Sequence, residues 1–579
     1  MELLLHQWGD WPELYRNTDK TEATEIVIID SQMNYRGKLD TYIPIKAITY
    51  PSMSYVIILK MYMYYMALEE IQVSEKITMG KSYADFLNEI SADDLFEGLL
   101  GYGLFANKLP PCFTSEGLCQ FYKTGKGEKL SSVNWREYIV FDSQRNTMVP
   151  RRFGIPVPHA YYHLCKALSG SWEKIRHHMV HAVSGQDYIV SRIHLRKRKG
   201  DKALFSMNYQ NWKVDGNPEP DLLLGNKYIV KSDISTCFPS IYTHSIPWAL
   251  VGKEKSKQDR KNNQWFNQID KQCQSCTNGE THGLLIGPHA SNLISEIILT
   301  QVDRKLYSNG WRYTRAIDDF TCYVPSIEKG EKFIRELRRE LAYYDLALNE
   351  KKTAIRELPF AINHEWVQQL RNVQEIYCRK EIIRYPDVAG YLASAISVME
   401  ENNHDGAPIN YVMKVLSGKK MTEPARDYLV KVLLHMAYLY PYLVHYLEEY
   451  IFLPYKVSTR QIQDFSNLLY DEGARRDQYE MMYFALYFAW IYGFEIYNVS
   501  AEKIISSNSC ICKVLALLYF QSIHQDKVLD MLRKHAKSFL NDDGDFDRNW
   551  LFAYEALNQD QLKNEWKAYK EAGVTFIKK

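Results

Sequence analysis

The stretch WRYTRAIDDFTCYV, Trp311–Val324, decides how the rest of the chain is interpreted. Its segments WRYTR and FTCYV predict two short strands, and the turn Ala316–Asp319 between them predicts a β-hairpin. The turn carries two adjacent acids, Asp318 and Asp319. Two carboxylates in one tight turn repel each other, and a hard cation such as Mg²⁺ takes carboxylate oxygens. The alternative is an ordinary solvated turn without chemistry.

A third acid ends another predicted strand. KYIVKSD, Lys227–Asp233, has the apolar pattern of a strand and ends on Asp233. Carboxylates on neighbouring strands can clamp two metal ions about 4 Å apart, which suits in-line phosphoryl transfer. Alone, neither Asp233 nor the pair carries that prediction, so the surrounding sequence has to decide.

Three further segments lie around the hairpin, one before it and two after it. GLLIGPHASNLISEIIL, Gly283–Leu299, predicts a glycine-containing loop that enters a helix, and this helix closes at Asn309–Gly310. Glu331–Asp345 predicts an amphipathic helix, and LALNEKKT, Leu346–Thr353, comes after it. Residues 227–360 thus alternate strand and helix signals.

These segments resemble the motifs of reverse transcriptases. SDISTCFPSIY (Ser232–Tyr242) resembles motif A, the glycine-containing loop and helix motif B, RAIDDF (Arg315–Phe320) motif C, and LALNEKKT motif D. Three stretches are similar to the bacterial abortive-infection and defence-associated reverse transcriptases. They are the sequence DISTCFPSIYTHSIPWA, the GP-x-x-S form of motif B and RRFGIPVPHAYY (Arg151–Tyr162). The resemblance covers residues 150–370 and implies a right-hand polymerase, with fingers and palm, that uses dNTPs and Mg²⁺.

The resemblance assigns roles at the metal site and around the nucleotide. Asp233, Asp318 and Asp319 match the catalytic triad, and the implied metal positions are these three and Ile234. The other matches are an aromatic gate against the ribose 2′-hydroxyl, a motif B glycine and serine, and a motif D lysine that donates a proton to pyrophosphate. They fall on Phe238, Gly287, Ser291 and Lys352, with Lys351 as a neighbouring alternative for the lysine.

A basic segment, Ser191–Lys202, lies between two stretches with strand character and predicts a hairpin. By resemblance to finger residues, some of Arg192, Arg196 and Lys202 should meet the triphosphate. The alternative is a solvated run of charge.

Two positions depart from the family pattern. Ala316 stands where motif C usually has Tyr or Phe, and Ile286 stands where motif B usually has Gln. The aromatic normally packs near the primer end, so alanine weakens that contact. Both changes put processive copying of a long template in doubt without touching the metal ligands.

The 579 residues are too many for one core, since single cores stop growing near roughly 250–300 residues. After residue 385 the strand signals stop and helices predict a HEAT-like or irregular array. We expect an α+β chain: an N-terminal extension of uncertain role (1–150), reverse transcriptase fingers and palm (151–385), and an all-α, helical-repeat-like C-terminal domain (386–579). Within it, residues 98–132 and 252–280 predict loops, and Pro247 should bend or end a helix.

Bulk charge does not indicate a nucleic-acid partner, because 71 Lys and Arg balance 70 acids to give net charge +1. Ten scattered cysteines predict a reduced, cytoplasmic protein. We expect no signal peptide and no membrane association, and the apolar stretch Met481–Phe494 predicts a buried helix.

Lesser signals carry alternatives. Cys273 and Cys276, with His282 and His289 downstream, could hold zinc, although a single C-x-x-C is weak. Glu296 and Asp303 predict a solvated helix face. Six clustered tyrosines could prime DNA on protein, as some relatives are thought to do, or could simply pack. They are Tyr438, Tyr440, Tyr442, Tyr446, Tyr450 and Tyr455.

The sequence therefore predicts an RNA-directed DNA polymerase of bacterial antiphage defence, copying a non-coding RNA. Its expected partners are dNTPs, the RNA, the DNA product, and a second defence protein or further copies of itself. One alternative is template-independent or protein-primed synthesis. Another is a non-catalytic RNA-binding subunit of a defence complex.

Overall fold

The computed structural model describes residues 81–578, apart from residues 126, 128–129, 131–134, 146–148, 207–211 and 360–364. All these residues belong to one compact unit, Ile77–Lys579. In the N-terminal extension the sequence also predicts a strand at TEIVIID, Thr24–Asp30, and a mostly apolar helix at Tyr55–Ile77. Both lie outside the described residues.

A four-stranded antiparallel sheet lies at the centre of the reverse transcriptase-like part. Its strand order is β4 (Tyr313–Ala316), β5 (Asp319–Val324), β3 (Tyr228–Asp233) and β6 (Ala354–Glu357). The predicted strand and hairpin are confirmed. Because β3 and β5 pair directly, the hairpin turn and the end of β3 lie at the same edge of the sheet, the one formed by the ends of the strands.

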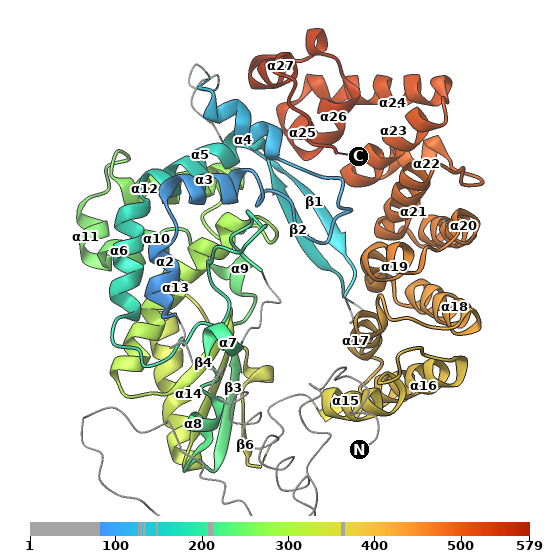
Figure 1. Cartoon of the computed structure of the whole chain (residues 1–579). Helices are drawn as coiled ribbons and strands as arrows, with labels where there is room; N and C mark the ends of the chain where they lie inside the picture. The colour runs from blue at the N-terminus through green and yellow to red at the C-terminus, as the bar shows by residue number, and fades with distance from the viewer. Residues whose placement is uncertain are drawn as a thin grey trace, which may run out of the picture. The chain divides into compact units, whose positions relative to one another are not determined.

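Two helices cover the sheet, and both were predicted. α14 (Ile327–Ala342) lies along the sheet, capped by the Ser326 hydroxyl, which accepts from the Lys329 amide (Figure 1). Its apolar residues recur at helical spacing, so one face is buried against the strands. α13 (His289–Ser308) is the motif B helix, and 15 of its 20 residues are buried.

A separate hairpin precedes these elements. β1 (Tyr138–Ser143) pairs antiparallel with β2 (Arg151–Pro156), and Pro158 then opens α5 (Pro158–Gly170). The Gly154 amide donates to the Ile286 carbonyl at 3.0 Å, which lays β2 against the motif B loop. The hairpin spans residue 150, so chain on both sides of the predicted domain boundary contributes to one element.

Several expected loops are partly helical. Residues 98–132 include α4 (Glu116–Lys123), and residues 252–280 include α11 (Lys253–Gln258) and α12 (Trp265–Ser275). The sequence did not predict α12, because most of its residues are polar. Only one side of the helix is buried, through Phe266, Ile269 and Cys273 among others. Pro247 does not bend a helix: it lies in the first turn of α10 (Ser245–Val251), where no intrahelical donor is lost.

Further helices complete the part before the sheet. α3 (Ala92–Leu100) begins with a capping box between Ser91 and Asp94. The helix before it, α2 (Tyr83–Asn88), begins with a capping box between Ser82 and Asp85. The remaining elements are α6 (Trp172–Val183), α7 (Trp212–Asp215), α8 (Glu219–Leu223) and α9 (Cys237–Ser240).

The basic segment Ser191–Lys202 is not flanked by strands in the described residues. Its ladder contacts are isolated bridges, Ser191 with Arg315 and Arg198 with Asp201. The Arg192 amide donates to the Arg315 carbonyl at 2.7 Å, so the segment follows the free edge of β4 instead of forming its own hairpin. The predicted hairpin is wrong in that respect.

The C-terminal part is an array of helices, as predicted, with no strand among its described residues. α21 (Tyr479–Tyr492) is enclosed on almost every side, which confirms the predicted buried helix. No described helix is long and apolar enough to span a bilayer. The longer helices are α15 (Glu365–Tyr377), α16 (Tyr385–Glu401), α17 (Ala407–Leu416), α18 (Glu423–Leu439), α20 (Thr459–Arg476), α23 (Cys510–Ser522) and α24 (Asp526–Ser538).

The end of the chain returns to its beginning. The Thr114 amide donates to the Phe576 carbonyl at 2.9 Å, and the Lys578 amide donates to the Cys112 carbonyl at 2.8 Å. Arg136 binds Asp547 and Glu565, each at 2.7 Å. The C-terminal helices are therefore tied to the part before the sheet through both backbone and ion pairs. Those nearest this tie are α25 (Asp543–Arg548), α26 (Trp550–Ala556) and α27 (Asn564–Glu571).

A buried acid makes a second tie, and it predicts a pH dependence. Glu480 of α21 accepts from the Ser143 hydroxyl at 2.9 Å and from the Gln144 amide, and burial raises its pKa to about 7. A raised carboxyl pKa means that folding holds a proton, so stability should fall as pH rises from about 4.5 to 7, by up to about 3 kcal/mol. Above that window it should level off.

Thermal unfolding across this pH range checks the expectation, with Glu480→Gln as the comparison. The amide keeps the size of the side chain but cannot ionise. Its Oε1 can accept from the Gln144 amide while its NH2 group donates to the Ser143 hydroxyl oxygen. The difference in melting temperature between the two proteins should therefore grow with pH in favour of the variant. Parallel pH profiles would contradict the assignment.

Candidate active site

Three aspartates meet at one edge of the sheet. Asp233 ends β3 and lies directly opposite Asp319, the first residue of β5, while Asp318 lies in the turn before it. The Ile234 amide donates to the Asp318 carbonyl at 3.2 Å, which fixes the turn against β3. Ile317 holds this tight turn in the left-handed region, with φ of 61°, a conformation that a β-branched residue rarely adopts.

The three carboxylates perturb one another. Burial, followed by the charges of Asp319 and Asp233, raises the pKa of Asp318 to about 6. Burial and Asp233 also raise the pKa of Asp319, against the opposing charges of Lys352 and Lys231. The Lys352 ammonium lies 2.6 Å from the Asp233 carboxylate, and the Asn349 amide donates to the same oxygen at 3.2 Å. Motif D is therefore in direct contact with motif A.

The donor set fits a hard divalent cation. Carboxylate oxygens are the ligands that Mg²⁺ prefers, and such an ion would offset the repulsion that raises these pKa values. Within the described ranges, no group of three or more His, Cys, Asp or Glu side chains is arranged closely enough to hold a metal ion. The aspartates thus converge on one edge without forming a closed cage, and Lys352 meanwhile neutralises Asp233.

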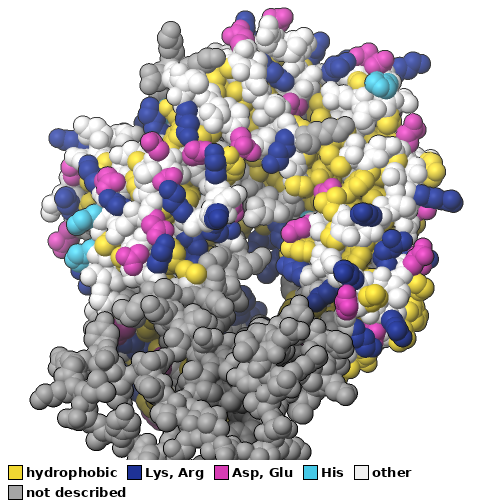
Figure 2. Space-filling view, in the orientation of Figure 1, with side chains coloured by type: hydrophobic (Ala, Val, Ile, Leu, Met, Phe, Trp, Pro, Cys, Tyr) yellow, Lys and Arg dark blue, Asp and Glu magenta, His cyan; other side chains and the backbone are white. Residues whose placement is uncertain are grey.

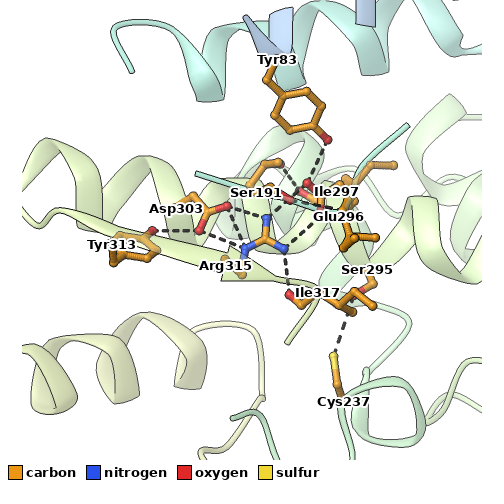
Figure 3. Close-up of polar contacts among 12 residues, drawn as sticks. Tyr83, Ser191, Cys237, Ser295, Glu296, Ile297, Asp303, Tyr313, Arg315 and Ile317 are labelled. Carbon is orange, nitrogen blue, oxygen red and sulfur yellow. Dashed lines mark hydrogen bonds and ion pairs between the residues drawn. The ribbon is translucent and has the colours of Figure 1, made fainter. Parts of the chain in front are cut away.

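A buried ion network supports the turn from behind (Figure 3). Arg315, with no exposed side-chain surface, binds Asp303 at 2.5 Å and Glu296 at 3.0 Å. Its guanidinium also donates to the Ile317 carbonyl at 2.8 Å. Burial opposes its charge, but the two carboxylates keep the pKa of Arg315 well above its usual value, so it stays charged.

The phenols of Tyr83 and Tyr313 complete the network by donating to Glu296 and Asp303 at 2.9 and 2.8 Å. The prediction that Glu296 and Asp303 form a solvated face is therefore wrong. Their helix is buried, and a charged partner lies inside the fold. The polar residues of α13 did not indicate that these acids are buried, because their partner Arg315 comes from another element.

The nucleotide-site candidates lie on elements that contact each other. Phe238, half-buried in α9, accepts from the Leu284 amide at 2.9 Å through its carbonyl, which joins motif A to motif B. Gly287 has φ of 126°, a backbone conformation that strains any residue with a Cβ, so glycine suits the position. The position lies against β2 and the loop after α3, because an added Cβ would be 3.4 Å from the Gly154 carbonyl and from Ala106. Ser291 is buried in the first turn of α13.

The basic candidates are committed to protein contacts. Arg196 is buried and binds Asp215 at 2.8 Å, so its predicted triphosphate contact is not supported by its placement. Arg192 donates to the carbonyls of Asp215 and Gly216, and Lys202 binds Glu97 at 2.6 Å. These contacts brace the segment against the fold, while the Lys202 side chain stays exposed, so the roles of Arg192 and Lys202 stay predictions.

Arg151 is the residue that the sequence interpretation missed. It opens β2 and is exposed, and the charges of Asp318 and Asp233 act on it. Burial and the neighbouring Arg145 lower the pKa of Arg151, while the two carboxylates oppose that shift. The motif RRFGIP held the signal, because β2 lies against the motif B loop, but the sequence did not show which arginine faces the aspartates.

The zinc alternative is not supported by the placement of its four residues. Cys273 and Cys276 are buried, His282 is exposed and lies 3.6 Å from Asp345, and His289 is buried at the start of α13. All ten cysteines are free and buried.

A family comparison agrees with the motifs. The model for "Reverse transcriptase (RNA-dependent DNA polymerase)" matches residues 201–381. The chain therefore contains a reverse transcriptase domain, the domain of RNA-directed DNA polymerases, which are nucleotidyltransferases. The predicted enzyme class is confirmed. The narrower resemblance to bacterial defence enzymes stays a prediction.

Solved structures add little. An apo telomerase of Candida tropicalis truncated from its C-terminal domain is 16% identical, with 42% of this chain and 54% of that chain covered and a TM-score of 0.26. The apo telomerase of the same organism is 12% identical, covering 68% and 73%, also with a TM-score of 0.26. Such scores support no argument about fold or function. No curated protein matches the chain.

Proposed function

We propose that the chain is a magnesium-dependent reverse transcriptase that makes DNA from dNTPs. The observation that carries the proposal is the register of β3 and β5, which brings Asp233, Asp318 and Asp319 to one sheet edge inside a reverse transcriptase domain. The four-stranded sheet then corresponds to a polymerase palm, and the β1–β2 hairpin to part of the fingers of a right-hand arrangement.

The three aspartates, with Ile234 beside them, are the residues to hold the metal. Bound there, Mg²⁺ would supply charge stabilisation for phosphoryl transfer and lower the pKa of a 3′-hydroxyl. Lys352, which pairs with Asp233 at 2.6 Å, is the candidate to donate a proton to the leaving pyrophosphate. Phe238 is the candidate that excludes the ribose 2′-hydroxyl, with Gly287 and Ser291 lining the approach.

The biological setting is proposed from the sequence motifs. Their similarity to bacterial defence-associated enzymes supports a role in antiphage defence with a non-coding RNA as template. Ten free, buried cysteines favour a reducing compartment such as the bacterial cytoplasm. The helical C-terminal array is the candidate contact region for a second defence protein or for further copies of the chain.

A nucleotide incorporation assay tests the proposal. The protein, purified with the nucleic acid it carries, receives Mg²⁺ and each labelled dNTP or NTP, before and after RNase treatment. Incorporation of dNTPs that RNase abolishes is expected. Incorporation that resists RNase would favour template-independent or protein-primed synthesis, and tight RNA binding without any incorporation would favour a non-catalytic subunit.

The exposure of the clustered tyrosines limits which of them could act as the primer in the protein-primed alternative. Of the six clustered tyrosines, Tyr442 and Tyr455 are buried, whereas Tyr438, Tyr440, Tyr446 and Tyr450 are partly exposed. Nuclease digestion followed by mass spectrometry would find a nucleotide on one of these four if the protein primes its own product.

Replacing Arg151 with alanine should raise the KM for dNTP about ten-fold or more and change kcat less. A charge-assisted contact to a phosphate contributes about 1.5–3 kcal/mol, and Arg151 is an exposed cation on which the charges of Asp318 and Asp233 act. Arg152→Ala is the matched control, because Arg152 is adjacent, exposed and 3.8 Å from Asp142. Equal effects of the two substitutions in steady-state kinetics would contradict the assignment.

A further inference from the structure

Five side chains from four parts of the sequence form a basic–aromatic strip: Arg151, Lys108, Tyr446, Lys414 and Tyr450. Arg151 comes from β2 and Lys108 from the loop between α3 and α4. Lys414 belongs to α17, and the two tyrosines belong to two short helices after α18. These are the 3₁₀-helix η5 (Pro441–Tyr446) and the π-helix η6 (Glu448–Phe452). The strip therefore joins the reverse transcriptase part to the C-terminal helices.

Cations and rings alternate along the strip. The Lys108 ammonium lies 5.3 Å from the Tyr446 ring, and the Lys414 ammonium lies 4.8 Å from the same ring and 5.7 Å from Tyr450. The two tyrosine rings are 6.0 Å apart. Lys108 also donates to His445 Nε2 at 3.0 Å, and burial with the charge of Lys108 keeps the pKa of His445 well below its usual value. The lysine is thus held in place by a neutral partner.

The cations of the strip lack acidic partners. None of Arg151, Lys108 and Lys414 forms an ion pair with a carboxylate of the described residues. The carboxylates that act on the lysines from a greater distance are Glu480 and Glu449. Burial lowers the pKa of Lys108 to about 8, and the charges of Lys414 and Arg151 add to that effect despite Glu480. Like charges are held near each other, which an anionic ligand would relieve.

The strip begins beside the motif B loop. Ala106, two residues before Lys108, lies 3.4 Å from the position that a Cβ of Gly287 would take, and the Gly154 carbonyl of β2 lies at the same distance. Arg151 lies on that same strand, and the charges of Asp318 and Asp233 act on it. At the other end, Lys108 contacts His445, the residue before Tyr446. In the space-filling view, Lys and Arg side chains gather around the hollow in the middle of the face shown (Figure 2). The strip therefore leads from the loop beside the proposed nucleotide site to the C-terminal helices.

We propose that the basic–aromatic strip binds the single-stranded DNA that leaves the active site. This inference rests on the proposed function, because the strand must begin at the aspartates. Single-stranded nucleic acid is held by cations that follow its backbone and by aromatic rings on which bases stack. Lys108 and Lys414 serve the phosphates, and the partly exposed rings of Tyr446 and Tyr450 serve the bases.

Binding of labelled oligo(dT) and oligo(U) to the full chain, followed by fluorescence anisotropy at several salt concentrations, tests the strip. Lys108→Gln with Lys414→Gln should weaken oligo(dT) binding about ten-fold and lower the salt slope by about 1.4, since each lost phosphate contact removes about 0.7. The control is Lys431→Gln with Lys503→Gln, which removes two charges that already pair with Asp427 and Asp477, each at 2.8 Å. These variants leave Arg151 and the aspartates intact.

Two single substitutions guard against misfolding of the double variant. Lys414 is exposed, so Lys414→Glu should fold and should weaken oligo(dT) binding more than Lys431→Glu does. Tyr450→Leu should weaken it about five-fold or more without changing the salt slope, because it removes stacking and not charge. Equal affinities and slopes in the strip and control variants would overturn the proposal.

The test separates this inference from the polymerase itself. Asp318→Asn removes the proposed chemistry and should leave oligo(dT) binding in place. If the chain incorporates no nucleotide while the strip variants still lose oligo(dT), the strip stands and the proposed function fails. If incorporation is normal and only oligo(U) binding depends on the strip, its assignment to the DNA product is overturned.

Discussion

Asp318→Asn should abolish nucleotide incorporation, by at least about a thousand-fold. The amide has nearly the same size and shape, but it removes one of the three carboxylates that the β3–β5 register brings together. A metal ion at that edge would lose an anionic ligand, and several kcal/mol of transition-state stabilisation would go with it. Single-nucleotide incorporation with Mg²⁺ measures the effect, and Asp319→Asn should match it.

Loss of activity should not come from loss of folding. Asp318 and Asp319 repel each other, so removing one charge should leave the melting temperature unchanged or raise it slightly. Asp530→Asn is the control, because Asp530 lies on α24, is largely exposed and forms an exposed ion pair with Arg533 at 3.5 Å. Near-normal incorporation by Asp318→Asn would remove the metal-ligand role and with it the central argument for the proposed function.

Arg315→Met should be the most destabilising single change in the site, at about 3–5 kcal/mol. It leaves Glu296 and Asp303 buried without their positive partner, and burying an unpaired charge is among the costliest changes in a protein interior. It also removes the donor to the Ile317 carbonyl, which holds the strained turn before Asp318. Chemical denaturation and incorporation kinetics together report both effects.

A triple variant separates the two roles of Arg315. Arg315→Met with Glu296→Gln and Asp303→Asn removes all three charges, while the amides still accept from the two phenols. Stability should largely return, because an uncharged set needs no counter-ion. Activity should stay about 10–100-fold below wild type, since the turn still lacks its support, an effect typical of residues behind metal ligands.

The control for the network is Tyr83→Phe. It removes one neutral donor to Glu296 and leaves the charge balance intact, so it should cost about 1–2 kcal/mol of stability and little activity. If the triple variant regains both stability and activity, Arg315 serves only to neutralise buried acids and has no part in positioning the turn.

The hairpin around Asp318 illustrates what local sequence can predict. Strand character on both sides of a two-acid turn is visible within a few residues, and so is the apolar spacing of α14. Such signals depend on backbone propensity and on the period of side chains, which act between near neighbours. The enzyme class followed from the order of four such segments, and the family match confirms it.

The misplaced predictions concern contacts between distant residues. Arg196 and Arg151 are both arginines in basic stretches, yet one is buried against Asp215 and the other is exposed, with the charges of Asp318 and Asp233 acting on it. Glu296 and Asp303 look like solvated acids until Arg315 is placed between them. The sequence position of a charged residue does not show whether its partner is water, a ligand or another buried charge.

The strands of the central hairpin, the motif helices and the three candidate aspartates are predictable from residue order, because they depend on local periodicity and on an ordered set of residue types. The folded chain is needed to show which charges are buried and how the C-terminal helices meet the rest of the protein. The energy of a charge depends on burial and on partners tens to hundreds of residues away, and only folding brings those partners together.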